Sequence, residues 1–414
     1  MRLPSLPRIR AGSGGGLPVG RLSLLYACLF FELGVNLPFF PLWLQAQALE
    51  SDAIGLILAA PLLVRVIANP TAGALADRSG RIAAALALCA VAVAACTGLL
   101  TVARGFWPIL LVVIAIALAQ GPLIALADAM TLGRLGEAPR SELTYGRIRL
   151  WGSLGFAAAN LVAGWSLEWF SASAVVPLLL ISAVLTAAAA ASCLTAAPQR
   201  RPERGSAARP AHPFLLAATI AGAALVQASH AAFYGFGTLH WQASGLPGTA
   251  MGGLWALGVL SEVAVFSVLG YRMTGAASAA GLLVLAAAAA VLRWAAMSRD
   301  PGLAALMGLQ LTQGMTFAVT HIGSIFLLAR LAPGGMQARA QTWLAGGWAG
   351  IMALLTTLSG RLYESWGEQI YLVMALVAAA GFLLLVSVAF GLRRVAEGGP
   401  SGATLPERSP PTMG

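Results

Sequence analysis

Lysine is absent from this chain of 414 residues, and charged residues of all kinds make up only 10% of it. Apolar residues amount to 59%, and the mean hydropathy is +0.82. A water-soluble fold of this composition would have too little polar surface to cover itself. The scarcity of charge therefore excludes a soluble protein and indicates a chain embedded in a membrane.

Cysteine is scarce as well, and the usual motifs of metal binding and catalysis are missing. The four cysteines fall in apolar stretches, with no spacing typical of a disulfide framework or a metal site. The sequence has no His-Glu-x-x-His helix, no Gly-x-Ser-x-Gly turn and no phosphate-binding loop. We therefore expect no metal, no cofactor and no enzymatic activity.

Long apolar stretches occupy most of the chain. A helix needs about 20 apolar residues to cross a bilayer, and twelve such stretches follow one another, separated by short polar turns. The expected spans are residues 22–44, 53–76, 82–103, 107–130, 147–168, 173–195, 214–240, 249–271, 275–297, 302–329, 338–362 and 369–392. They predict an all-α integral membrane protein with twelve transmembrane helices.

The arginines are distributed unevenly between the connecting segments. Of the 25 arginines, 20 fall on the side of the N-terminus, three in the opposite loops, and Arg65 and Arg293 within the expected spans. An excess of positive charge marks the cytoplasmic side of a membrane protein. We therefore expect an inner-membrane protein with both termini in the cytoplasm. The net charge of +10 then meets lipid headgroups and is no evidence for nucleic acid.

A polar segment rich in arginine and proline, residues 196–213, divides the expected spans into six and six. It predicts an N-terminal half over 1–195 and a C-terminal half over 214–392, related as two structural repeats. A disordered cytoplasmic tail is expected over 393–414.

Direct comparison of the two halves gives a weak internal repeat. The second and eighth spans match at an offset of 197, and the fourth and tenth match at 193 through Gln120-Gly121 and Gln313-Gly314. A parallel repeat places matched residues at the same depth in the membrane. In this alignment Arg65 corresponds to Glu262, and Asp128 corresponds to His321.

The segment 73–81, Gly-Ala-Leu-Ala-Asp-Arg-Ser-Gly-Arg, lies between the second and third spans. It resembles the cytoplasmic signature loop of the major facilitator superfamily. The resemblance implies a transporter with two six-helix halves. It assigns Gly73, Asp77, Arg78, Gly80 and Arg81 to a loop that takes part in the conformational change.

Three further segments narrow the resemblance. Residues 37–44, 145–153 and 230–242 are similar to the 3-phenylpropionate permease group, a relative of the lactose permeases and the nucleoside–proton symporters. This implies secondary active transport by alternating access, with proton-coupled uptake of an aromatic carboxylate favoured. Sugar or nucleoside symport and proton-driven efflux are the alternatives. The fifth span lacks the proline-containing motif of the efflux antiporters, which favours uptake.

Charged residues within the expected spans are the candidate functional residues. A charge near the bilayer centre costs about 2.5–3.5 kcal/mol and needs a partner or a water-filled cavity. By resemblance to lactose permease, Glu262, Arg293 and His321 couple the proton, while Asp128 and Arg149 hold the substrate. The tenth span lacks the acid that sugar permeases place one turn beyond His321.

The remaining candidates come from the residues themselves. Glu32 is a further candidate for proton binding, because a carboxyl group shielded from water holds a proton more readily. Arg65 lies too deep to reach the headgroups, so we expect it to face Glu262, Glu32 or Asp128 and to contribute to substrate binding. His230, Tyr234 and Trp241 could face the substrate too.

Three alternatives stay open at this point. Arg293 could extend to the outer headgroups, Arg149 could meet lipid phosphates, and the aromatic residues could belong to the interfacial belt. The expected partners are a small-molecule substrate, the proton and the lipid bilayer, and we expect a monomer.

Overall fold

The computed structural model describes residues 19–79, 81–135, 141–194, 212–269, 275–333 and 336–398. Almost all of these residues are helical, and no strand occurs within the described ranges. The helices are α1 Val19–Ala46, α2 Ser51–Ser79, α3 Ile82–Leu99, α4 Phe106–Gln120, α5 Leu123–Leu135, α6 Ser141–Phe170, α7 Val175–Ala191, α8 Pro213–Ala228, α9 Ala231–Ala243, α10 Gly248–Leu269, α11 Ala276–Met297, α12 Leu303–Leu311, α13 Thr320–Leu331, α14 Gln337–Trp366 and α15 Ile370–Gly398.

The helices match the apolar pattern of the sequence. Nine stretches of the described chain are long and apolar enough to cross a membrane. Two of them, Thr144–Ala191 and Arg339–Val395, comprise 48 and 57 residues, and each contains two long helices joined by a short 3-10 turn. The all-helical membrane architecture is confirmed, whereas the count of twelve spans stays a prediction.

Three of the expected spans are interrupted near their middle. Gly121 and Pro122 separate α4 from α5, Ser229 and His230 separate α8 from α9, and a π-helical turn, Gly314–Val319, separates α12 from α13. Proline lacks a backbone N–H and disturbs the preceding turn, and π-turns inside helices are frequent at functional sites. Irregular backbone at this depth is tolerated where it lines a cavity.

Two helices extend past the expected domain boundaries. α8 begins at Pro213, the last residue of the expected linker, and α15 continues to Gly398 instead of ending at 392. The first six residues of the expected tail, 393–398, are therefore helical and not disordered. The rest of the tail and most of the linker lie outside the described residues.

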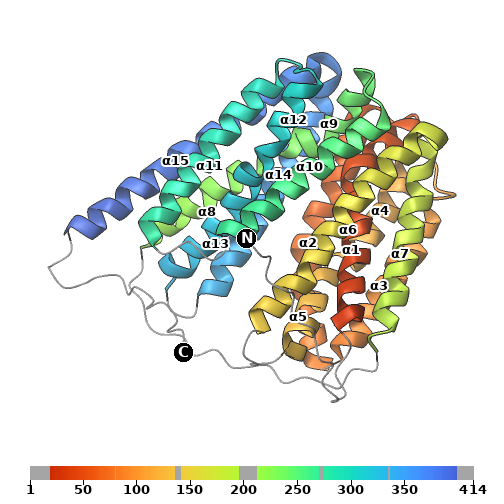
Figure 1. Ribbon diagram of the computed structural model, residues 1–414, viewed down its shortest axis with the longest axis horizontal. Helices are drawn as coiled ribbons and strands as arrows, with labels where there is room; N and C mark the ends of the chain where they lie inside the picture. Colours follow the sequence, from red (N-terminus) through yellow and green to blue (C-terminus); the bar gives the residue numbers. More distant parts are fainter. Residues whose placement is uncertain are drawn as a thin grey trace, which may run out of the picture.

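Two groups of helices, α1 to α7 and α8 to α15, meet near one end and diverge toward the other (Figure 1). Across the groups, α2 packs along α14, α6 packs along α10, and α1 contacts α9. We call the end at which α2 begins and α6 ends the closed end, and the opposite end the open end.

Glycines allow the backbones to approach at the closed end. A Cβ atom added to Gly55 of α2 would lie 3.0 Å from the Cα atom of Gly360 in α14. A Cβ atom added to Gly164 of α6 would lie 2.9 Å from the Cα atom of Gly252 in α10. Small residues at such crossings are typical of membrane helices, because dispersion contacts between close backbones hold the helices together. The close contact of these helices at the closed end therefore requires glycine, which has no side chain, at the crossing positions.

Replacing Gly252 with leucine is expected to separate α6 from α10 at the closed end. The added Cβ atom would collide with the backbone of Asn160, and overpacking of this kind costs about 1–3 kcal/mol. A cost of this size changes the ratio of two conformations by about fivefold to 150-fold. Spin labels on the exposed positions Ser173 and Arg299 should report a longer mean distance by double electron–electron resonance.

Gly253→Leu is the matched control for this prediction. It changes the neighbouring residue of the same helix, where an added Cβ atom meets nothing within 4 Å. Equal distance distributions in the two variants would show that close backbone contact does not hold this end shut.

Candidate functional site

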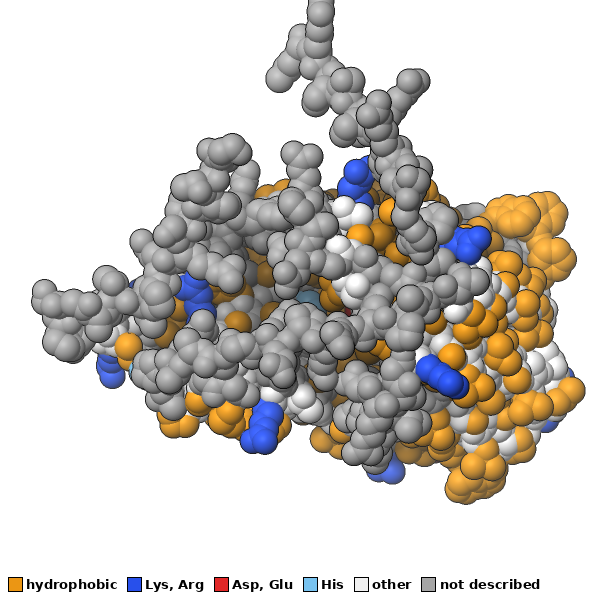
Figure 2. Space-filling model, turned by 90° about the horizontal axis from the view of Figure 1, so that it is seen from below, with side chains coloured by type: hydrophobic (Ala, Val, Ile, Leu, Met, Phe, Trp, Pro, Cys, Tyr) orange, Lys and Arg blue, Asp and Glu red, His pale blue; other side chains and the backbone are white. Residues whose placement is uncertain are grey.

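A cavity of about 1480 Å³ lies between the two helix groups. Figure 2 shows the open end, where arginine side chains surround a central hollow that exposes a histidine and an acidic side chain. The charged and titratable side chains that line the cavity, apart from tyrosine, are Glu32, Arg65, Arg147, Arg149, Glu262 and His321. The cavity thus gathers most of the ionisable groups that the sequence places within the spans.

In the N-terminal half, α1, α2 and α4 bring Glu32, Arg65 and Gln120 together. The Arg65 guanidinium donates a hydrogen bond to the Oε1 atom of Gln120. The Nε2 atom of Gln120 donates to the Glu32 carboxylate over 2.7 Å. Arg65 therefore reaches one of its expected partners, Glu32, through an amide. Glu32 lines the cavity beside this amide but is only 2% exposed.

In the C-terminal half, Arg293 of α11 is held by neutral oxygen atoms. Its guanidinium donates to Gln313, to Gln310 over 3.1 Å and to the Thr316 hydroxyl over 3.1 Å. Its Cζ atom lies 5.1 Å from the ring centre of Phe233, a cation–π contact. Arg293 is 1% exposed, so it points inward and does not extend to the headgroups.

Gln313 links this arginine to Glu262 of α10. Its Oε1 atom accepts from Arg293, while its Nε2 atom donates to the Glu262 carboxylate over 3.0 Å and to the Tyr234 hydroxyl over 3.1 Å. Both ends of the amide are used, and its orientation is fixed because an arginine can only donate. The structure thus brings together Glu262, Arg293 and Tyr234, all of which the sequence singled out.

Asp128 and Arg149, expected to act as a pair, have different partners. Asp128 accepts hydrogen bonds from the hydroxyl groups of Tyr26, over 2.5 Å, and Tyr145, over 2.9 Å. The Arg149 guanidinium lies over the ring of Phe30, with its Cζ atom 3.9 Å from the ring centre. Within the described part of the chain, Arg149 has no carboxylate partner. It lines the cavity as an unpaired cation on an aromatic surface.

The remaining candidates divide between cavity and interior. His321 was expected in proton coupling, and His230, Tyr234 and Trp241 were expected in substrate binding. Tyr234 and His321 line the cavity. His230 is fully buried, contacts the Thr316 hydroxyl through its Nε2 atom over 3.2 Å, and packs edge-on against Trp294. Trp241 is 2% exposed and packs in the aromatic core. His230 and Trp241 therefore support the wall of the cavity rather than line it.

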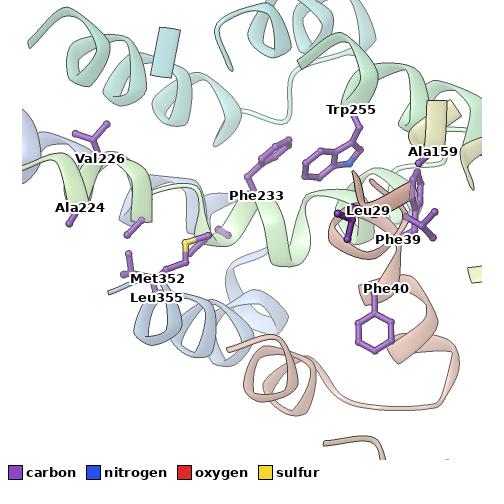
Figure 3. Packing of buried hydrophobic residues seen from close by; sticks show 14 of the residues in the cluster. Leu29, Phe39, Phe40, Ala159, Ala224, Val226, Phe233, Trp255, Met352 and Leu355 are labelled. Atoms are coloured by element: carbon purple, nitrogen blue, oxygen red, sulfur yellow. The ribbon is translucent and has the colours of Figure 1, made fainter. Parts of the chain in front are cut away.

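Stacked aromatic side chains form that wall. The rings of Phe233 and Trp255 stack with centres 4.6 Å apart, and both line the cavity (Figure 3). The indole nitrogen of Trp255 donates to the Thr238 hydroxyl over 2.9 Å. Trp255 therefore has a fixed orientation in the wall of the cavity.

The expected conformational loop is described in part. Gly73, Asp77 and Arg78 belong to the last turns of α2, and Arg81 directly precedes α3. Gly80 lies outside the described residues. The role of these five residues stays a prediction.

Three glutamines were missed as functional residues by the sequence analysis. From the sequence, Gln120 and Gln313 indicated only how the two halves align, and no role was predicted for Gln310. A signal existed: the pair Gln-Gly recurs at an offset of 193, inside otherwise apolar spans. A polar side chain in such a stretch needs a hydrogen-bonding partner, and here the partners are charges.

A cavity with linked buried charges between two helix groups defines the chain as a multi-pass membrane transporter. It belongs to the MFS_1-like family, whose family model matches residues 19–375. It is 31% identical to a probable 3-phenylpropionic acid transporter of Escherichia coli over 88% of this chain and 96% of the relative. It is 32% identical to a maltose permease of Geobacillus stearothermophilus over 90% of this chain and 95% of the relative.

Solved structures support the same fold. The crystal structure of the nucleoside transporter NupG superimposes with a TM-score of 0.72 at 18% identity, covering 89% of this chain and 98% of that one. A peptide transporter of the POT family, in complex with alafosfalin, gives 0.70 at 15% identity, covering 94% and 96%. The similar proteins are transporters and not enzymes.

Replacing Arg293 with lysine is expected to destabilise the protein although the charge is kept. A lysine ammonium lacks the planar fork that serves three acceptors at once, and a lost hydrogen bond to a charged group costs about 1.5–3 kcal/mol. We expect the melting temperature in detergent to fall by about 2–3 °C, measured by intrinsic fluorescence. Arg299→Lys, at an exposed position, is the control and should leave it unchanged. An unchanged melting temperature in Arg293→Lys would contradict the fork geometry.

Proposed function

We propose that this protein is a proton-coupled symporter that takes up a small aromatic carboxylate by alternating access. The observation that carries the proposal is the unpaired Arg149 cation in a cavity walled by aromatic rings. A guanidinium binds a carboxylate through two parallel hydrogen bonds, and aromatic faces accommodate a ring. The relative with 31% identity is named for 3-phenylpropionic acid, which has both groups.

We propose that Arg149 and Arg65 bind the substrate carboxylate, with Tyr234 and Trp255 beside its ring. All four line the cavity. Asp128, held by two tyrosines, keeps the α1, α5 and α6 segments in place beneath this site. His230 and Trp241 act as supports of the aromatic wall.

Glu262 is proposed as the proton carrier, with Arg293, Glu32 and His321 adjusting its surroundings. Its carboxyl lines the cavity from α10 and receives one amide hydrogen bond. Protonation would remove a negative charge from a cavity that also holds a substrate anion, so the proton and the anion favour each other's binding. Buried carboxyl groups are suited to proton exchange, because burial disfavours the charged form.

The arrangement also suggests how the protein sits in the membrane. The excess of arginines places the N-terminal side in the cytoplasm, so the open end faces the cytoplasm and the closed end faces outward. The proposal therefore includes an inner-membrane location with cytoplasmic termini, twelve spans and a monomer whose two halves, 1–195 and 214–392, move as bodies. The state seen is the one that releases substrate to the cytoplasm.

Uptake into proteoliposomes tests the proposed function. Radiolabelled 3-phenylpropionate, maltose and a nucleoside are offered with and without an imposed pH gradient, acid outside. We expect the carboxylate to accumulate, faster with the gradient. Accumulation of maltose or the nucleoside alone would support the sugar or nucleoside alternative, for which the maltose permease and NupG are the precedents. Expulsion of substrate by the same gradient would support antiport.

Glu262→Gln is expected to abolish stimulation by the pH gradient while substrate exchange between the two sides continues. The amide cannot take up the proton, but it keeps the volume of the carboxyl. Initial rates of gradient-driven uptake and of counterflow are compared in the same vesicles. Glu364→Gln, an exposed acid at the closed end, is the control. An unchanged gradient response in Glu262→Gln would remove this residue from proton coupling.

Arg149→Gln is expected to raise the KM for 3-phenylpropionate about tenfold or more, because a charge-assisted bidentate contact is lost. Competition by the neutral methyl ester should change less than competition by the acid. Arg361→Gln, an exposed arginine, is the matched control. Equal KM values for the acid in the two variants would contradict the proposed anion site.

A further inference from the structure

The two halves contain the same three-part arrangement. Gln120 lies between Arg65 and Glu32, and Gln313 lies between Arg293 and Glu262. In both cases Oε1 accepts from the arginine and Nε2 donates to the carboxylate. The two glutamines occupy equivalent positions of the repeat, at the offset of 193. We call these the N-triad (Glu32, Gln120, Arg65) and the C-triad (Glu262, Gln313, Arg293).

The triads have opposite polarity toward the cavity. In the N-triad the buried end is the acid Glu32, at 2% exposure, and the arginine is partly exposed. In the C-triad the buried end is Arg293, at 1% exposure, and the acid Glu262 is partly exposed. The more exposed charge is therefore the arginine in the N-triad and the acid in the C-triad. Arg65 of the N-triad suits an anionic ligand, and Glu262 of the C-triad suits a proton.

Each glutamine keeps an arginine and a carboxylate apart. No ion pair joins Arg65 to Glu32, or Arg293 to Glu262, in the described structure, because the amide occupies the gap. The amide still transmits the interaction, since its fixed dipole presents a donor to the acid and an acceptor to the base. Breaking a direct buried ion pair by removing one partner leaves an uncompensated charge, at a cost of about 3–5 kcal/mol.

Both glutamines lie at breaks in their helices. Gln120 is the last residue of α4, before Gly121 and Pro122. Gln313 directly precedes the π-helical turn, and the N–H group of Gly314 donates to the Ser261 hydroxyl over 2.9 Å. A side chain at a break can shift with less loss of backbone hydrogen bonding than one inside a regular helix.

We propose that Gln120 and Gln313 are the positioning residues of two separate ligand sites, a substrate-anion site at Arg65 and a proton site at Glu262. Gln120 holds the Arg65 guanidinium toward the cavity, and Gln313 holds the Glu262 carboxylate within the influence of Arg293. This proposal rests on the proposed function, and it deepens it by dividing binding and coupling between the halves.

The surroundings of Glu262 bear on its response to pH. Several charged and titratable side chains lie on the described elements that pack against α10. They are Tyr145, Arg147, Arg149 and Glu168 on α6, Tyr234 and His240 on α9, and His230 directly before α9. Neither α12 nor the π-helical turn carries such a group, and His321 follows on α13. Tyr234 and Arg293 are the two that share Gln313 with Glu262.

The test compares Gln313→Met with Gln120→Met in the full-length protein in proteoliposomes. Methionine matches the length of glutamine but offers no amide. In Gln313→Met the carboxylate loses its donor, so the pH of half-maximal uptake should rise by about one unit, with KM within about twofold of the parent. In Gln120→Met the guanidinium loses its acceptor, so KM for 3-phenylpropionate should rise about tenfold, with a smaller change of the pH midpoint than in Gln313→Met.

Controls and second variants keep the comparison decisive. Gln227→Leu removes another buried amide, 5% exposed, whose Nε2 atom has no hydrogen-bond partner in the described structure, and it should change neither parameter. If a methionine variant does not fold, Gln313→Asn and Gln120→Asn, which are one methylene shorter, replace it. They should show the same pattern, with smaller changes of the pH midpoint and of KM. Counterflow of substrate at fixed pH reports folding and binding apart from proton coupling.

The outcomes separate this proposal from the proposed function. A split in which Gln313 variants move the pH midpoint and Gln120 variants move KM supports two positioned sites. Equal changes of both parameters in both variants, or no change beyond that of Gln227→Leu, would overturn it. If the parent protein shows no response to the pH gradient, the proposed symport itself fails, whatever the variants do.

Discussion

A charge inside an apolar layer must be compensated, and this constraint organises the centre of the molecule. An uncompensated arginine or glutamate at this depth costs several kcal/mol, yet Glu32 and Arg293 are almost completely buried. Their compensation comes through glutamine side chains rather than through direct ion pairs. Gln310 and Thr316 complete the shell around Arg293. Helix breaks at α4 and at the π-helical turn lie beside these amides.

The closed end is held by a different kind of contact. Backbone touches backbone at Gly55 with Gly360 and at Gly164 with Gly252. A carboxylate also connects the two helix groups at this end: Glu168 of α6 accepts a hydrogen bond from the backbone N–H of Thr249, at the start of α10, over 2.9 Å. A carboxylate at a helix N-terminus stabilises by about 0.3–1 kcal/mol. Such contacts are short in range and easily separated, as a transporter that alternates between two states requires.

Much of the fold followed from the sequence, because apolar length and arginine distribution are strong signals in membrane proteins. The helix interruptions were not predicted from the sequence. Pro122 indicates one of them, but no residue type around Ser229 indicates the break between α8 and α9. The site was anticipated for Glu262 and Arg293, since buried charge is conspicuous. The role of Gln313 was not anticipated, because a neutral amide can be assigned a role only when its hydrogen-bond partners are known. The expected Asp128–Arg149 pair does not form, because Asp128 instead accepts hydrogen bonds from Tyr26 and Tyr145. The sequence spacing of these tyrosines does not predict that contact.

The recurrence of glutamine at equivalent positions has a chemical explanation. The side chain between an arginine and a carboxylate must offer an acceptor on one side and a donor on the other, and it must stay neutral. Asparagine offers the same groups on a shorter stem, and histidine would itself titrate near neutral pH. Glutamine meets all these requirements whichever charge faces the cavity. The repeat can therefore keep one amide while the residue opposite it is Arg65 in one half and Glu262 in the other, so that a single architecture accommodates two unlike ligands.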